Sequence, residues 1–202
     1  MKERFAILDT PLEGLKVIRR KPQTDERGYF ERLFCADELR TLMGTKGIAQ
    51  INHSFTSKRG TVHGMHFQHP PHAEVKFVSC LSGEVFDVAV DLRRDSPTFL
   101  HSYAEVLSSA NYKTLVIPEG FAHGYQALVD DSQIVYVVSV GYTPSAEGGI
   151  HPEDPLLRIA WPLPVTGLSQ RDLTRPYLDS NFTGVRLFQL DENALSRSRS
   201  TA

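Results

Sequence analysis

Two histidine-bearing segments of the chain carry the residue types best suited to acid–base chemistry. Residues 63–68 read His-Gly-Met-His-Phe-Gln, and residues 118–123 read Pro-Glu-Gly-Phe-Ala-His. Imidazole has an unperturbed pKa close to neutral pH, so it serves readily as a general base or acid. A turn through proline and glycine followed by His123 is typical of small β-barrels in which a polar side chain lines the barrel. Two such strands in one barrel predict a polar cavity, and such a cavity is usually a site.

Strand alternation predicts which side chains share this cavity. Successive residues of a strand point to opposite faces, so residues two apart lie on one face. Glu74 shares a face with Lys76, and we expect it to pair with the ammonium group, because lysines are seldom buried unpaired. The lumen is predicted to hold His66, Gln68, Lys76, His123, Tyr136 and Tyr142. A base, a cation and two phenols suit acid–base chemistry with stabilisation of a developing oxyanion. Asp87 and Asp91, on another strand, are expected to be structural.

The elements that must position these residues are short strands separated by turns. Turn residues recur at short, regular spacing, which predicts an all-β fold, either a sandwich or a closed barrel. A short helix is expected at residues 36–43, and Ser169 can cap another that begins at Gln170. Residues 143–156 are predicted to be a loop. The predicted strands cover residues 4–22 (one or two strands), 29–34, 47–55, 61–68, 73–81, 84–92, 101–107, 113–117, 123–129 and 133–142.

Composition limits the class of protein. The chain has 202 residues, which suits one domain over residues 1–195, with a disordered, Ser- and Arg-rich tail at residues 196–202. A net charge of −2 gives no general attraction to nucleic acid or to an anionic membrane. No apolar run is long enough to span a membrane. The two cysteines do not make a disulfide framework, so we expect a cytoplasmic protein.

Several stretches together resemble the dTDP-4-dehydrorhamnose 3,5-epimerase family of nucleotide-sugar enzymes. The similarity runs from about Asp25 to Asp172, and no single stretch would be specific. The resemblance implies a cupin-like jelly-roll barrel with short peripheral helices, a homodimer, and no metal or organic cofactor. It also implies inversion of carbons 3 and 5 of a 4-keto-6-deoxyhexose carried on a nucleoside diphosphate. The matching stretches are residues 25–28, 50–54, 64–68, 83–91, 96–99, 107–108, 117–124 and 159–162.

The resemblance also assigns roles to individual residues. His66 matches the base, and Asp172 matches the carboxylate that orients it. Tyr136 matches the acid on the opposite face of the sugar, and Lys76 matches a lysine near the C4 oxygen. Both inverted carbons are α to the C4 ketone, so their protons can be removed if the enolate is stabilised. The substrate-binding positions are matched by Arg27, Gln50, Asn52, His63, His123, Tyr142 and Arg171.

Two departures from the family pattern concern the nucleotide. The family carries arginine three residues before the catalytic histidine, where His63 stands here. Histidine is a weaker and pH-dependent partner for a diphosphate than arginine. A family glutamate near the nucleobase falls on Arg32, with Glu31 beside it. An epimerase for a different nucleotide sugar, or one that inverts a single carbon, therefore remains an alternative.

The alternative from another class is a metal-dependent cupin, such as a dioxygenase or a sugar isomerase. Its ligands would be drawn from His63, His66, His123, and Gln68 or Glu74. The His-x-His pair of metal cupins is absent, and residues three apart are expected on different faces of a regular strand. A non-catalytic sugar-binding barrel is a third possibility, but it would not need a base, an orienting carboxylate, a cation and an acid together.

Overall fold

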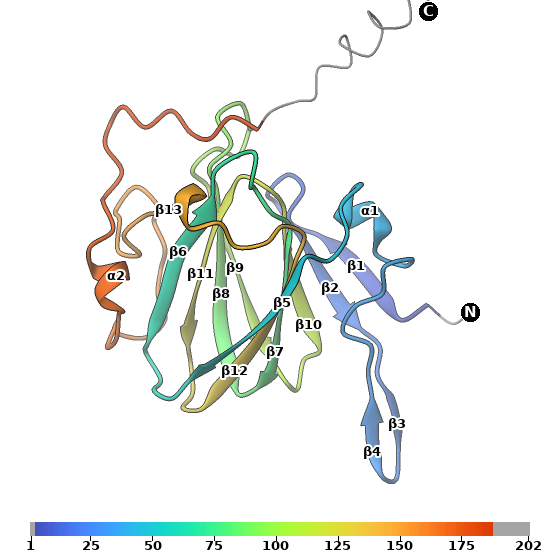
Figure 1. Ribbon diagram of the computed structural model, residues 1–202. Coiled ribbons are helices and arrows are strands. Elements are labelled where there is room, and N and C mark those ends of the chain that lie inside the picture. The colour runs from blue at the N-terminus through green and yellow to red at the C-terminus, as the bar shows by residue number, and fades with distance from the viewer. Residues whose placement is uncertain (1–2, 188–202) are drawn as a thin grey trace, which may run out of the picture.

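The computed structural model describes residues 3–187, which form two large antiparallel sheets packed face to face (Figure 1). The six-stranded sheet has the order β1-β2-β10-β7-β12-β5, and the five-stranded sheet has the order β13-β6-β11-β8-β9. A third, two-stranded sheet is the hairpin β3–β4. The strands are β1 (Phe5–Asp9), β2 (Lys16–Arg20), β3 (Gln23–Asp25), β4 (Gly28–Phe30), β5 (Gln50–Thr56), β6 (Val62–Gln68), β7 (Lys76–Ser82), β8 (Glu84–Asp91), β9 (Ser102–Ser108), β10 (Lys113–Ile117), β11 (Phe121–Ala127), β12 (Ser132–Val138) and β13 (Glu147–Gly149).

The space between the two large sheets is partly filled by an apolar core and partly left as a polar cavity. The core takes Leu115 and Ile134 from the six-stranded sheet and Val85, Ala89 and Leu107 from the five-stranded sheet, all buried. These residues come from strands that alternate inward and outward, as expected for a sheet with one face on the core. The all-β, jelly-roll prediction is confirmed.

The outer face of the five-stranded sheet is also buried. Met65, Val88 and Val90 point away from the cavity and pack against Leu157 and Val185 of the C-terminal segment. That segment runs over the outside of the sheet and carries α2 (Gln170–Leu173) close to β6 (Figure 1). The strands of this sheet are therefore apolar on the outer face, and their inward positions are free to carry polar side chains.

The outer face of the six-stranded sheet is covered by the segment around α1 (Arg40–Met43). Leu39 and Met43 pack there against Phe77 and Val116, and Phe34 meets Phe77 edge to face at 5.2 Å between ring centroids. Aromatic rings prefer this geometry. The helix is shorter than the predicted range of 36–43.

The hairpin β3–β4 projects away from both sheets (Figure 1). Its base is held by a buried ion pair in which Arg20 Nε lies 2.7 Å from Glu31 Oε2. Arg20 also donates to the hydroxyls of Ser79 and Thr114 inside the six-stranded sheet. The strand predicted at residues 29–34 ends at Phe30, because Glu31 turns back to this anchor.

Residues 143–156 were expected to form a loop, but they include the 3₁₀ helix η1 (Pro144–Ala146) and the strand β13, which pairs with β6. The predicted disordered tail lies outside the described residues, and the single domain over residues 1–195 stays a prediction. Among residues 3–187, no helix is long and apolar enough to cross a membrane.

Candidate active site

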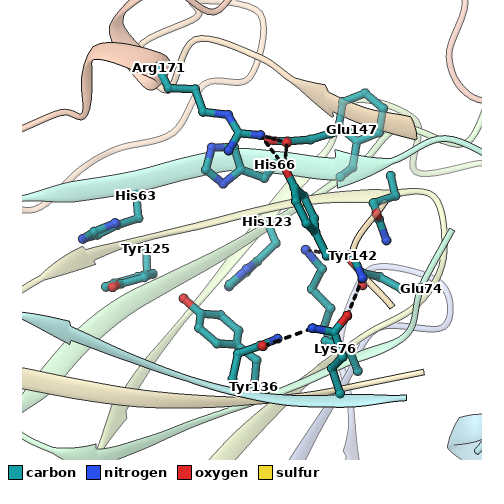
Figure 2. A pocket seen from close by; sticks show the side chains of 15 residues that line it. His63, His66, Glu74, Lys76, His123, Tyr125, Tyr136, Tyr142, Glu147 and Arg171 are labelled. Atoms are coloured by element: carbon teal, nitrogen blue, oxygen red, sulfur yellow. Dashed lines mark hydrogen bonds and ion pairs between the residues drawn. The ribbon is translucent and has the colours of Figure 1, made fainter. Parts of the chain in front are cut away.

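A cavity of about 250 Å³ lies between the two sheets and collects most of the predicted site residues (Figure 2). Both sheets contribute to its walls, because β6 and β11 face β5, β7 and β12 across it. It is lined by Gln50, Asn52, His63, His66, Phe67, Gln68, Glu74, Lys76, His123, Tyr125, Tyr136, Val138, Tyr142, Glu147 and Arg171.

His66 projects from β6 into the cavity and is held by Asp172 of α2. The distance from His66 Nε2 to Asp172 Oδ1 is 2.5 Å, and the Asp172 side chain is only 3% exposed. Ser169 caps α2 by accepting a hydrogen bond from the Asp172 backbone N–H at 3.1 Å, which fixes the aspartate at the start of the helix. Burial opposes ionisation of Asp172, but hydrogen bonds from His66 and Ser169 outweigh it and lower the pKa of the carboxyl. Asp172 is therefore a carboxylate at neutral pH, which directs the N–H of His66 to Nε2 and leaves the lone pair on Nδ1.

Tyr136 faces the same cavity from the opposite sheet, where it sits in β12 (Figure 2). Burial, together with the nearby Tyr125 and Asp87, raises the pKa of its phenol well above the usual value. The phenol is therefore protonated at neutral pH and can donate a proton. Its ring meets His123 edge to face at 5.8 Å between centroids. A base and a proton donor thus stand on opposite walls.

Lys76 brings the predicted cation into the cavity from β7. Its Nζ lies 3.2 Å from Glu74 Oε1, and the two side chains are 13% and 11% exposed. The predicted Glu74–Lys76 pair is therefore present. A mostly buried ammonium interacts more strongly with a negative oxygen in the cavity than a solvated one would.

His123 is held by Asp87 of β8, a residue whose part in the site the sequence interpretation missed. Its Nε2 lies 3.0 and 3.1 Å from the two carboxylate oxygens. Burial raises the pKa of Asp87, although His123 and Lys76 partly offset this effect. We expected Asp87 to be structural. The available signal was its alternation with Phe86 and Val88, which pack outward and so direct Asp87 inward.

His63 lies in the cavity beside His66, contrary to the prediction that they occupy different faces of β6. The cause is an irregularity in the strand. His66 pairs with His123, whereas His63 pairs with Tyr125, so the register shifts by one residue between them. A one-residue shift moves a side chain to the other face of a sheet. Burial lowers the pKa of His63, Asp172 opposes that effect and His66 adds to it. His63 is therefore neutral at neutral pH.

The remaining wall is a polar cluster around Glu147, a residue that the sequence analysis did not select. Glu147 of β13 pairs with Arg171 and accepts a hydrogen bond from the Tyr142 hydroxyl at 2.6 Å. Gln50 accepts a hydrogen bond from the Tyr142 backbone N–H, and Gln68 accepts one from Thr143. These contacts fix the segment that carries Tyr142. Glu147 was missed because β13 was predicted to be loop.

Known proteins similar to this chain belong to one enzyme family. The model of the dTDP-4-dehydrorhamnose 3,5-epimerase family matches residues 9–180. The chain belongs to this family. A dTDP-4-dehydrorhamnose 3,5-epimerase of Salmonella typhimurium is 39% identical over 175 residues, which are 86% of this chain and 95% of the relative. A dTDP-4-dehydrorhamnose 3-epimerase of Streptomyces niveus is 38% identical over 162 residues, 80% of this chain and 78% of the relative.

Solved structures agree with the family. The crystal structure of dTDP-6-deoxy-D-glucose-3,5-epimerase from Legionella pneumophila, in complex with dTDP-4-keto-L-rhamnose, matches with a TM-score of 0.84 and 38% identity. The match covers 92% of this chain and 100% of the other.

Among the predicted site residues of this epimerase-family chain, only Arg27 neither lines the cavity nor bonds to a residue that lines it. Arg27 lies on the hairpin β3–β4, its side chain is 84% exposed, and it pairs with Asp25 at 2.6 Å. The residues around it belong to the hairpin, and none of them lines the cavity that holds His66. Within one chain, Arg27 therefore lies outside the cavity, and its role as a substrate ligand stays a prediction. The hairpin's exposed rings, Tyr29 and Phe30, are 51% and 66% accessible.

The imidazoles proposed as metal ligands for a cupin are each engaged elsewhere. Nε2 of His66 bonds to Asp172, Nε2 of His123 bonds to Asp87, and Nε2 of His63 lies 3.1 Å from Thr56 Oγ1. Among residues 3–187, no group of three or more His, Cys, Asp or Glu side chains is arranged to share one ion. The absence of a metal cofactor stays a prediction.

Proposed function

We propose that the protein inverts C3 and C5 of a dTDP-linked 4-keto-6-deoxyhexose by proton removal on one face of the sugar and proton delivery on the other. Membership of the family makes the chain an epimerase of nucleoside-diphosphate 4-keto-6-deoxyhexoses, and so an isomerase. The number of inverted carbons, the nucleotide and the residue roles are the proposal. The observation that carries them is the placement of the His66–Asp172 pair and Tyr136 on opposite sheets around one cavity.

In the first step, Nδ1 of His66 removes the proton α to the C4 ketone. The electron pair of the C–H bond moves into the ring, and the negative charge of the enolate collects on the C4 oxygen. Asp172 stabilises the imidazolium that forms, because its carboxylate already accepts the Nε2–H. Lys76 stabilises the enolate oxygen, since its ammonium is mostly withdrawn from water.

In the second step, the Tyr136 hydroxyl donates its proton to the same carbon from the opposite face. The electron pair returns from the enolate, the ketone reforms and Tyr136 becomes a phenolate. The raised pKa of the Tyr136 phenol keeps the proton in place until the enolate is ready to accept it. A positioned acid or base typically contributes about 10²–10⁴ in rate.

The size of the cavity indicates which part of the substrate it holds. Its volume of about 250 Å³ is below the roughly 300–1,000 Å³ of sites that enclose drug-sized ligands. The sugar would therefore occupy the cavity and the nucleotide would extend out of it. In this arrangement, Gln50, Asn52, Tyr142 and Arg171 contact the substrate beside the catalytic pair.

A homodimer would explain the position of Arg27. The hairpin β3–β4 reaches away from its own cavity and presents an arginine and two exposed aromatic rings. Strand β5 ends the six-stranded sheet and exposes Ile51 and Phe55, which are 64% and 56% accessible. A second copy docked on these surfaces would cover the apolar side chains and could bring Arg27 to the nucleotide in its partner's site.

Two further proposals concern the setting of the reaction. Cys35 and Cys80 are free thiols, which supports a cytoplasmic location.

The neutral His63 and the presence of Arg32 near the hairpin support a nucleotide other than dTDP as the second candidate.

The test is NMR of the purified protein in deuterated water with dTDP-4-keto-6-deoxyglucose. Deuterium at both C3 and C5, with inversion at both, is the expected result. Deuterium at one carbon would limit the activity to a mono-epimerase. If the folded protein exchanges no proton of this compound but does exchange those of a CDP-, GDP- or UDP-linked 4-keto sugar, the dTDP assignment is wrong.

A further inference from the structure

Two successive inversions on one bound sugar require that Tyr136 be protonated again between them. Each inversion leaves one proton on His66 and removes one from Tyr136. The second inversion cannot use Tyr136 until its phenolate has been protonated again. The bound sugar occupies the cavity at that stage, so a route that does not cross the sugar would be an advantage.

A chain of hydroxyl groups leads from Tyr125 to His63 and has no part in the mechanism described above. The Tyr125 hydroxyl lies 2.8 Å from Thr56 Oγ1 and 3.1 Å from Ser54 Oγ. Thr56 Oγ1 in turn lies 3.1 Å from His63 Nε2. Tyr125 is 1% exposed and Thr56 is 4% exposed. The chain is therefore shielded from water, except at its end in His63.

Tyr125 and Tyr136 line the same cavity from opposite sheets. Tyr125 comes from β11 of the five-stranded sheet, and its hydroxyl crosses to Ser54 and Thr56 on β5. Strand β5 is the direct neighbour of β12, where Tyr136 stands opposite Asn52 and Ile134 stands opposite Ser54. The Tyr136 side chain points toward Tyr125 across the cavity, and the two phenols are near enough to shift each other's pKa (Figure 2).

We propose that His63, Thr56 and Tyr125 form a proton relay that returns a proton to Tyr136 between the two inversions. This inference rests on the proposed function, because it requires Tyr136 to act as the proton donor and both carbons to be inverted. Tyr125 does not touch the reacting carbons in this scheme. It is a positioning residue that acts through Tyr136.

The transfer conserves every proton. Tyr125 gives its hydroxyl proton to the Tyr136 phenolate, Thr56 gives its own to Tyr125, and His63 gives its Nε2 proton to Thr56. His63 takes up one proton from water at Nδ1, an atom for which the described residues provide no hydrogen-bond partner. The imidazole therefore ends as the other neutral tautomer, and one proton has moved from water to Tyr136. No redox partner or cofactor is required.

The two phenols differ in acidity in the direction that this transfer needs. Burial raises the pKa of both phenols. Their mutual interaction lowers the pKa of Tyr125 and raises the pKa of Tyr136 further. This difference favours transfer of a proton from Tyr125 to the Tyr136 phenolate. The ring of Tyr125 also stacks on that of His63, with 4.8 Å between ring centroids and an interplanar angle of 12°. This stacking fixes the positions of the two rings relative to each other.

The test follows the products of Tyr125→Phe and Thr56→Val over time by NMR in deuterated water with dTDP-4-keto-6-deoxyglucose. Tyr125→Phe keeps the ring that stacks on His63, and Thr56→Val keeps the shape of the threonine. We expect the first inversion to stay within about twofold of the wild-type rate and the second to slow by about tenfold or more, so that the singly inverted sugar accumulates. Thr56→Ser restores the hydroxyl and should restore the wild-type product ratio.

Several results would overturn the relay. Equal slowing of both inversions would show that Tyr125 and Thr56 only support the structure of the site. An unchanged product ratio in both variants would show that Tyr136 is recharged by another route. A wild-type protein that inverts one carbon has no need of recharging, which removes the relay but leaves the epimerase in place. A wild-type protein that exchanges no proton with any of the nucleotide sugars would instead refute the proposed function itself.

Discussion

The ionised Asp172 decides which nitrogen of His66 can accept a proton. Its carboxylate lies 2.5 Å from His66 Nε2, so the N–H is held there and the lone pair is held on Nδ1. An amide in place of the carboxylate could present its NH₂ group to Nε2 and would then favour the opposite tautomer. It would also lose the negative charge that stabilises the imidazolium.

The substitution Asp172→Asn tests this role. We expect kcat to fall by about 10²–10⁴ while the circular dichroism spectrum stays unchanged, because the shape of the side chain is conserved. Steady-state kinetics with dTDP-4-keto-6-deoxyglucose measures the effect. A variant within about threefold of the wild-type kcat would show that Asp172 does not orient the base.

Asp172 also links stability to pH. Its pKa in the folded protein lies below the ordinary value of 3.8, which represents the unfolded chain. The carboxylate therefore contributes stability above that value, and the contribution is lost as the pH falls through the folded pKa. Urea unfolding in acid should show a smaller loss of stability with falling pH for Asp172→Asn than for the wild type. Parallel curves would contradict this expectation.

At the scale of elements, the irregularity in β6 brings His63 and His66 to one cavity. Gly64 lies between them with φ at +123°, a conformation that residues with a side chain rarely adopt. A Cβ added there would lie 2.6 Å from Gly124 Cα and 2.8 Å from the His123 carbonyl oxygen. The close approach of β6 and β11 therefore requires glycine at this position.

The substitution Gly64→Ala should destabilise the protein by about 2 kcal/mol or more, because the clash is with backbone atoms that cannot move aside. For a chain of this size that corresponds to a fall in Tm of about 4–8 °C. Gly47→Ala is the matched control, since Gly47 has no positive φ and a Cβ there would meet no atom within 4 Å. Equal Tm values for the two variants in thermal unfolding would contradict this account of β6.

Strand alternation in the sequence predicted some of the inward-facing residues but not all of them. Alternation predicted that His66 and Gln68 face the cavity, and both line it, because regular strands make that rule reliable. It failed for His63, since a register shift depends on the neighbouring strand and leaves no local pattern except a glycine. It also left Glu147 out, because a three-residue edge strand carries too little periodicity to be recognised.

At the scale of the whole molecule, the two sheets divide the chemistry between them. The proposed base, His66, stands on the five-stranded sheet, and the proposed proton donor, Tyr136, stands on the six-stranded sheet. The apolar core between the sheets fixes their spacing, and so fixes the gap in which the sugar would lie. Arg27 was predicted to bind substrate because its segment resembles a family motif. A motif does not indicate whether a residue acts in the site of its own subunit or in that of a partner subunit.

Mixing two inactive variants tests whether sites are shared between copies. Arg27→Ala and His66→Ala should each have low activity alone, because one lacks a nucleotide contact and the other lacks the base. Subunits exchanged between them would form dimers in which one site contains both substitutions and the other contains neither. Recovery of activity on mixing, approaching about a quarter of the wild-type value, is expected for a shared site. If the mixture is no more active than its components, Arg27 does not act across an interface.

The most direct test of the central claim compares His66→Ala and Tyr136→Phe in deuterated water with dTDP-4-keto-6-deoxyglucose. NMR measures deuterium and configuration at C3 and C5 in the same sample. The two-wall arrangement predicts that His66→Ala incorporates no deuterium, because nothing removes the proton. Tyr136→Phe should still incorporate deuterium but invert poorly, since the proton returns from the face on which it left. Substantial exchange in His66→Ala, or full inversion in Tyr136→Phe, would contradict the account.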